Sequence, residues 1–165
     1  MENRDIPETG RWFDAHLHWQ AEAWAGAADA AAVRARAAGV DGWCCCGTQP
    51  ADWSAVAEWG RAFPGQVSAY GLHPWFLDQP PADWAAQLRA RLVADPAAAV
   101  GEFGLDHGLA SYDPAAQAQV FRIQWDLARE LDRVAILHCR RAWQALDECL
   151  RAAPAPRRGF VLHAY

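Results

Sequence analysis

Lysine is absent from this chain of 165 residues, and all 15 basic side chains are arginines. The formal net charge at pH 7 is −5. The chain therefore has no overall positive field to attract nucleic acid. A polyanionic substrate would have to be held by a local arginine cluster or by metal ions.

Three further absences narrow the class of protein. No stretch approaches about eighteen uninterrupted apolar residues, so no membrane span is expected. The N-terminus lacks a positively charged region followed by an apolar core, so no signal peptide is expected and we predict a cytoplasmic protein. The 5 cysteines include no C-x-x-C pair, which argues against a structural zinc site and against a disulfide framework. We predict that the adjacent Cys44, Cys45 and Cys46 are small buried residues of a strand.

The composition that is present suits one globular domain. A hydrophobic fraction of 53% and a charged fraction of 21% are ordinary for a folded protein of this size. Residues 1–10 are polar and are expected to form a loose leader ahead of a single domain over residues 11–165. Of the 10 tryptophans, those in helix-like segments are expected to pack against a sheet: Trp24, Trp53, Trp59, Trp84, Trp125 and Trp143. Trp19 and Trp75 differ, because each directly follows a histidine motif.

Strand-like and helix-like segments alternate from residue 11 onward. Strands are predicted over residues 11–15, 40–46, 66–72, 97–103, 134–137 and 159–162. Helices are predicted over residues 21–38, 52–63, 83–94, 113–131 and 141–151. This alternation is typical of parallel strands joined by right-handed crossovers.

Polar residues stand at the carboxyl ends of most predicted strands. These ends fall at His16, Gly47, His73, Glu102, His138 and His163. An α/β barrel gathers its active site at that rim, whereas an open doubly wound sheet gathers its ligands at one switch point. We therefore predict an α/β fold of the TIM-barrel type, in which about six of the eight β/α units are present and the parallel barrel is incomplete.

The strand-end residues form a candidate metal site. His16 and His18 project from the same face of an extended strand and could bind one divalent cation, or they could be two hydrogen-bonded histidines without a ligand. Glu102, His138 and His163 stand at the same rim. Four imidazoles are too many for one zinc ion with an open position, but they suit two ions that share a bridging carboxylate.

Five ordered motifs resemble the TatD family of metal-dependent hydrolases. They are Phe13–His18, Gly71–Pro74, Gly101–Asp106, Leu137–Arg140 and Val161–Tyr165. The likeness runs from residue 11 to the last residue. It implies an amidohydrolase-like barrel with divalent-metal-dependent deoxyribonuclease activity.

The resemblance also implies the roles of the metal-binding residues. His16 and His18 would bind the first ion, Glu102 would bridge the two ions, and His138 and His163 would bind the second. The ions would be Zn²⁺, Mg²⁺ or Mn²⁺.

Other residues of the motifs are candidates for substrate contact or support. The resemblance places His73 at the cleft, where we expect it, with Glu102, to take part in catalysis. Arg140 is a candidate for binding a phosphate, since its guanidinium fork matches phosphate oxygens, and an ion pair with a carboxylate of the neighbouring strand is the alternative. Asp14 is expected to orient an imidazole, and Asp106 is expected to have a structural role.

The implied function is hydrolysis of phosphodiester bonds in DNA, or of another phosphate ester. In the family, a later strand supplies an aspartate to the first metal ion, whereas this sequence ends at Tyr165 after six predicted strands. We therefore expect a chain that lacks the last two barrel units and has two open sheet edges, either as a fragment of a longer protein or as a truncated member. The alternative hypothesis is a catalytically impaired remnant that binds metal, or a scaffold completed as a homo-oligomer.

Overall fold

The computed structural model describes residues 11–163, so the predicted leader at residues 1–10 and the last two residues lie outside the described part. Within it, one parallel sheet has its strands in chain order, each paired with the next. The strands are β1 (Trp12–Leu17), β2 (Val40–Cys46), β3 (Gln66–Tyr70), β4 (Ala99–Asp106), β5 (Ala135–Arg140) and β6 (Phe160–His163). The predicted α/β fold with parallel strands is confirmed.

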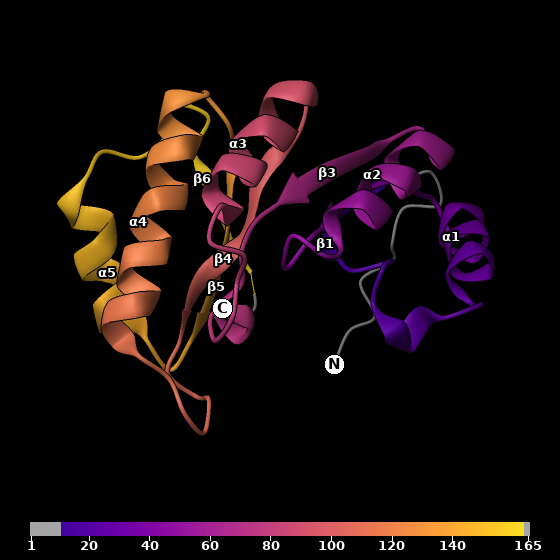
Figure 1. Ribbon diagram of the computed structural model, residues 1–165. Coiled ribbons are helices and arrows are strands. Elements are labelled where there is room, and N and C mark those ends of the chain that lie inside the picture. Colours follow the sequence, from indigo (N-terminus) through magenta and orange to yellow (C-terminus); the bar gives the residue numbers. More distant parts are fainter. Residues whose placement is uncertain (1–10, 164–165) are drawn as a thin grey trace, which may run out of the picture.

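Helices form the connections between successive strands. They are α1 (Ala28–Ala37), α2 (Trp53–Ala62), α3 (Trp84–Ala94), α4 (Pro114–Glu130) and α5 (Trp143–Ala152), with the short 3-10 helices η1 (Glu22–Trp24) and η2 (Pro74–Phe76). Figure 1 shows the helices around the outside of the curved sheet, where α3 packs beside α4. None of the helices within residues 11–163 has the length and apolar character that a bilayer crossing requires.

Local sequence explains where two of the helices begin. Asp113 caps α4, because its carboxylate accepts the backbone N–H groups of Ala115 and Ala116 at 2.8 and 3.1 Å.

The continuous helix predicted over residues 21–38 is wrong. Gly26 has a φ of 74°, a left-handed conformation that interrupts the segment between η1 and α1.

The position of Glu102 also differs from the prediction. We expected it near the end of a strand over residues 97–103, but β4 continues to Asp106 and is buried along its whole length. The apolar residues Phe103 and Leu105 carry the strand onward. Gly104 permits this, since a Cβ atom there would lie 1.8 Å from the carbonyl oxygen of His138 on β5. Glu102 therefore lies inside the curved sheet, with strands on both sides of it.

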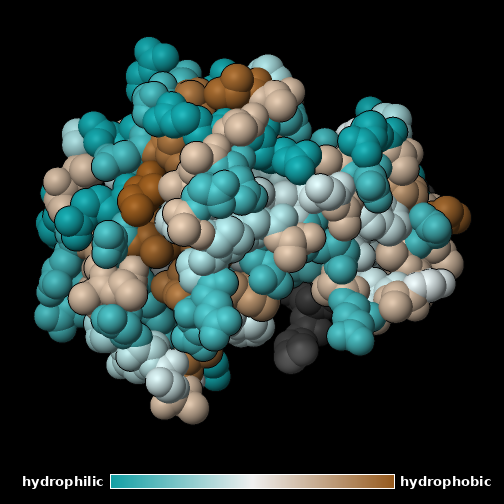
Figure 2. Space-filling model, viewed as in Figure 1, coloured by the Kyte–Doolittle hydropathy of each residue, from teal (hydrophilic) through white to brown (hydrophobic). Residues whose placement is uncertain are grey.

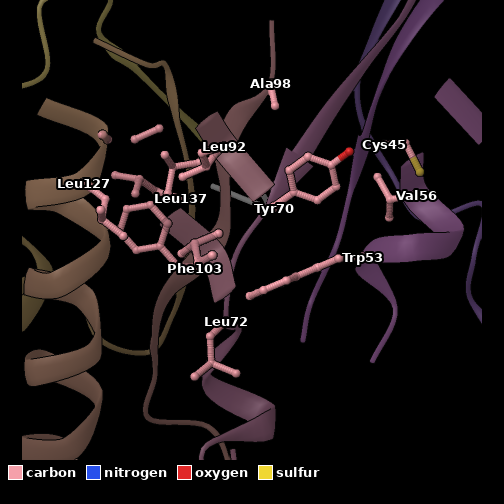
Figure 3. Packing of buried hydrophobic residues seen from close by; sticks show 14 of the residues in the cluster. Cys45, Trp53, Val56, Tyr70, Leu72, Leu92, Ala98, Phe103, Leu127 and Leu137 are labelled. Atoms are coloured by element: carbon pink, nitrogen blue, oxygen red, sulfur yellow. The ribbon is translucent and has the colours of Figure 1, made fainter. Parts of the chain in front are cut away.

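The main hydrophobic core lies between the sheet and the helices. Figure 3 shows Leu127 of α4 directed toward Phe103 and Leu137 of the strands. The predicted packing of tryptophans is confirmed for Trp53, Trp84 and Trp125, which are buried. Figure 2 shows that hydrophilic side chains cover most of the opposite, outward surface of these helices.

Two other tryptophans depart from the expected pattern. Trp24 and Trp143 are 37% and 44% exposed, so they are not core residues. Each stands at the boundary of a helical segment, where less of the side chain can reach the sheet. Trp19, which follows the first histidine motif, is buried and stacks near Trp59 with ring centres 5.9 Å apart.

The inner face of the sheet carries a separate and smaller group of side chains. Cys44, Cys46 and Ile136 are buried there, which confirms the prediction for the cysteine run of β2. A mainly apolar cavity of about 380 Å³ lies on this face, and Phe13 of β1 and Val161 of β6 contribute to its wall. The two edge strands of the described sheet thus border one inner space, as the predicted incomplete barrel requires.

Two glutamines of helix α4 form hydrogen bonds to the main chain at Asp106 and at Leu72, the residue before His73. The buried side chain of Gln124 accepts the N–H of Leu72 at 2.7 Å and donates to the Leu72 carbonyl at 3.0 Å. About two turns earlier on the same face of this helix, Gln117 makes the same pair of bonds to Asp106 at 2.9 and 3.0 Å. These two amides therefore set the positions of Asp106 and of the residue before His73.

We predict that Gln124→Met lowers the free energy of unfolding by about 2 to 4 kcal/mol. The substitution keeps the side-chain length but leaves two buried backbone groups of Leu72 without partners, at about 1 to 3 kcal/mol each. Urea denaturation measures the change. Gln119→Met, at an exposed position of the same helix, is the matched control and should change stability by less than about 0.5 kcal/mol. Equal effects of the two substitutions would contradict the role given to Gln124.

Candidate metal centre

The centre is built around the carboxylate of Glu102, which is only 2% exposed. Its Oε2 atom lies 3.1 Å from Nε2 of His16 and 3.3 Å from Nε2 of His18. Its Oε1 atom lies 3.1 Å from Nδ1 of His138 and 3.7 Å from Nε2 of His73. The curved sheet therefore surrounds one buried carboxylate with four imidazoles that come from distant parts of the chain.

Two groups of three side chains could each hold a metal ion. One consists of His16, Glu102 and His163, and the other of His73, Glu102 and His138; within each group the ligand atoms lie within 4.8 Å of one another. Glu102 belongs to both groups, as a bridging residue would. The grouping differs from the expected pairs, since the ring of His163 stacks on that of His16 with centres 3.4 Å apart. The assignment of ligands to individual ions stays a prediction.

Cys46, at the end of β2, contacts both histidines of the first motif. Its carbonyl oxygen lies 2.6 Å from Nδ1 of His18. A carbonyl only accepts, so Nδ1 of His18 carries a proton; Nε2 then donates to Glu102 when the ring is protonated, and offers its lone pair to a metal ion when the ring is neutral. The Cys46 sulfur lies 3.5 Å from Nδ1 of His16. One residue of β2 thus orients both imidazoles.

Asp106 orients His138 in the same manner. Its Oδ2 atom lies 3.3 Å from Nε2 of His138, so that Nδ1 of the ring faces Glu102. The buried carboxylate of Asp106 also accepts the indole N–H of Trp75 at 2.7 Å and the backbone N–H of Gly108 at 2.8 Å. Burial opposes ionisation of Asp106, but the hydrogen bonds from Trp75 and Gly108 outweigh it and hold its pKa below the usual value.

His73 differs from His18 and His138, because its outer ring nitrogen accepts a hydrogen bond instead of donating one. Its Nδ1 atom accepts the backbone N–H of Trp75 at 3.2 Å, so in the neutral ring the proton resides on Nε2. Burial lowers the pKa of His73 to about 3, which keeps the ring neutral near pH 7. In this tautomer His73 is a donor toward the centre, and it would act as a metal ligand only in the other tautomer. This geometry agrees with the expected contact to substrate.

The charge of Glu102 controls the titration of its neighbours. Burial opposes its ionisation, yet hydrogen bonds from His138 and His16 outweigh burial and keep the pKa of Glu102 well below its usual value. Burial alone would lower the pKa values of His18 and His138, but the hydrogen bond and negative charge of Glu102 raise both above 6.5. In contrast, burial, together with the nearby His16, lowers the pKa of His163.

A cavity of about 520 Å³ opens above the centre. Its wall includes Glu102, His73 and His138, together with His18 and His163. The sequence-predicted imidazoles and the carboxylate are therefore brought together at one place.

Arg140 and Asp14, two further candidates from the motifs, contact groups other than those expected of a phosphate ligand and of a support for an imidazole. Arg140 is outside the lining of this cavity, with a side chain that is 51% exposed and Nη1 3.8 Å from Oδ2 of Asp106 on β4. This contact is the ion-pair alternative considered for it. Asp14 does not orient an imidazole as expected. Its carboxylate instead accepts the backbone N–H of His16, two residues further along β1, at 3.1 Å.

Sequence reasoning missed Cys46 as a support for the site. It acts largely through its carbonyl oxygen, and a main-chain atom leaves no mark in the residue type. The one feature of the sequence that could have indicated this role is the position of Cys46 directly before Gly47, at the end of a predicted strand. Gln20, which also donates to the Cys46 carbonyl at 2.7 Å, was missed for the same reason.

The donor set suits divalent metal ions. Imidazole nitrogens bind Zn²⁺ well, and a carboxylate can bridge Zn²⁺, Mn²⁺ or Mg²⁺. The buried charge of Glu102 and the oriented lone pairs of His18 and His138 are what such ions require. A parallel β/α sheet that gathers such a donor set near the carboxyl ends of its strands is the arrangement used by metal-dependent hydrolases.

Comparison with known proteins gives the family. A family model described as "TatD related DNase" matches residues 13–165, and the chain belongs to this family. It is 32% identical over 159 residues to the uncharacterized metal-dependent hydrolase YjjV of Escherichia coli, covering 94% of this chain and 60% of that protein. The crystal structure of YjjV superposes with a TM-score of 0.88 at 30% identity, over the same shares of the two chains.

Other relatives carry the name of a nuclease. The chain is 33% identical over 133 residues to the 3'-5' ssDNA/RNA exonuclease TatD of Erwinia tasmaniensis, which is 80% of this chain and 51% of that protein. A TatD family hydrolase from Entamoeba histolytica has the same fold, with a TM-score of 0.77 at 18% identity over 87% of this chain and 55% of that one. The chain thus spans about half the length of the curated relatives it matches.

We predict that the metal-free protein loses stability as the pH rises above 6.5. His18 and His138 have pKa values raised by folding, so their contribution is fully present below 6.5, the unfolded value, and is lost as the pH rises through the folded values. Urea denaturation at pH 6.5 and 8.0 measures this slope. With excess Zn²⁺ the slope should reverse, because the metal binds deprotonated imidazoles.

His138→Gln tests the origin of this slope. The variant should show a smaller loss of stability between the two pH values, since one of the two raised imidazoles is gone. His107→Gln replaces an imidazole outside the Glu102 cluster and should keep the wild-type slope. An unchanged slope in His138→Gln would contradict the assignment.

Proposed function

We propose that this site hydrolyses phosphodiester bonds of single-stranded nucleic acid with two bound divalent metal ions. The observation that carries the proposal is one buried carboxylate shared by two groups of imidazoles on the wall of an open cavity. The names of the nuclease relatives support the choice of substrate. The proposed ligands are His16, His18, Glu102, His138 and His163.

When bound, such ions would polarise a phosphoryl oxygen and lower the pKa of a bound water. The side chains of the chain itself hold and orient the reacting groups. Glu102 supplies the shared negative charge, while Cys46 and Asp106 keep the lone pairs of His18 and His138 directed toward it. These supports fix the geometry before substrate arrives.

Two further side chains would contact the substrate. His73 is neutral and lines the cavity, and its Nε2 carries a proton at 3.7 Å from Oε1 of Glu102, so it could donate to a phosphate oxygen bound beside Glu102 without adding a charge. Arg140 is half exposed, and its ion pair with Asp106 is long at 3.8 Å. Its guanidinium can therefore take a phosphate further along the strand.

A second candidate is a metal-binding scaffold completed by another copy of the chain. Exposed apolar side chains on both edge strands favour it: Trp12 and Phe13 on β1 are 50% and 54% exposed, and Phe160 on β6 is 39% exposed. Such edges favour association. Solution mass from light scattering separates the candidates, since this one requires a dimer or larger assembly with bound metal and no turnover.

We predict that the full chain, loaded with Zn²⁺ or Mn²⁺, shortens a 5′-labelled single-stranded oligonucleotide. His16→Ala should reduce the rate by more than about 100-fold, because even the outer supports of metal ligands are worth 10- to 100-fold. His107→Ala is the matched control and should retain activity within about twofold. Metal content per chain, measured on the same samples, should fall for His16→Ala alone. If the loaded wild-type chain cleaves no faster than His16→Ala, the hydrolase proposal fails.

A further inference from the structure

Trp75 is an exposed aromatic residue on the wall of the catalytic cavity. It belongs to η2, directly after the His73-Pro74 pair, and 55% of its surface is exposed. The cavity that it lines contains Glu102 and His138. A large indole ring thus faces solvent beside a wall made mostly of polar and charged side chains.

The ring of Trp75 is held in place from two sides. Its Nε1–H donates to Oδ2 of Asp106 at 2.7 Å, and its backbone N–H donates to His73 at 3.2 Å. The ring stands edge-on to His73, with centres 5.0 Å apart and planes at 83°. Pro74 restricts the backbone directly before it. The indole is therefore a fixed surface and not a mobile side chain.

Anchoring of Asp106 does not by itself account for this residue. A single N–H donor would serve that purpose, and a smaller polar side chain could supply it. The indole also leaves a large apolar face in water, which is costly unless a ligand covers it. The feature left unexplained is the aromatic face, and a flat apolar ligand is what would cover it.

We propose that Trp75 stacks on an unpaired base of the nucleic-acid strand next to the bond that is cleaved, an inference that rests on the proposed function. The centre of the indole lies 6.3 Å from that of His138, so a nucleotide whose phosphate reaches the metal-binding side chains has its base within reach of the ring. Every base has a π-face, so such stacking tolerates any sequence. Bases of a duplex are already paired and stacked, and Trp75 therefore selects single strands.

The test uses two 5′-labelled strands of equal length, one of thymidylates and one whose last 3′ positions are abasic. Trp75→Ala removes the ring and the N–H, whereas Trp75→Phe keeps a ring and removes only the bond to Asp106. We expect Trp75→Ala to lower kcat/KM on the base-bearing strand by about 5- to 150-fold more than on the abasic strand, as for other aromatic stacking platforms, since loss of the bond to Asp106 affects both strands alike. Trp75→Phe should keep most of the preference for bases. Trp143→Ala, at an exposed tryptophan of α5, is the matched control.

Two results would overturn the inference. One is an equal loss on both strands with Trp75→Ala, and the other is a loss in Trp75→Phe as large as in Trp75→Ala. Either result would mean that Trp75 acts only by donating its hydrogen bond to Asp106.

Fluorescence anisotropy with the same strands, in the Glu102→Gln background, separates this inference from the proposed function. Glu102→Gln chains with Trp75 should bind the base-bearing strand at least about fivefold more tightly than the abasic one, and Trp75→Ala should remove that difference. If the wild-type chain cleaves neither strand but this difference in binding is present, the hydrolysis proposal fails and the stacking inference stands. If cleavage occurs and no difference is found, the stacking inference fails alone.

Discussion

The burial of one negative charge, that of Glu102, is the constraint on which the rest of this structure depends. An ionised carboxylate in a sheet interior is stable only when partners compensate it. Here the partners are imidazoles from β1, from the turn after β3 and from β5, so each of these segments must converge on β4. The curvature of the sheet, the long β4 and the close approach at Gly104 all serve that convergence.

The same imidazoles differ in what they can do because their second nitrogens have different partners. His18 and His138 donate to oxygen atoms of Cys46 and Asp106, so the nitrogen at the centre donates to Glu102 in the protonated ring and offers a lone pair to a metal ion in the neutral ring. His73 accepts from the backbone of Trp75, which leaves a proton there. Chemically identical side chains thus become ligands or donors according to a neighbour on the next strand or turn.

The order of strands and helices, the parallel sheet and the residues of the centre could be predicted from the sequence, because each rests on side-chain type and spacing. The break at Gly26 could not, since a left-handed φ in an alanine-rich segment has no signal beyond the glycine itself. The mid-strand place of Glu102 depends on packing of Phe103 and Leu105, and the partnership of His16 with His163 depends on sheet curvature. The roles of Cys46 and of the α4 glutamines lie in bonds to or from the main chain, which residue identity does not encode.

The two glutamines of α4 have a consequence for the order of assembly. Gln117 and Gln124 bind the main chain of segments made before α4, at Asp106 and Leu72. The strand ends that carry Asp106 and His73 therefore gain their final support only after α4 has formed and docked. His16 and His18, near the start of the chain, exist as a pair well before their carboxylate is in place. His138 and His163 follow α4 in the chain, so the whole candidate donor set converges only where both ends of the described sheet are in place.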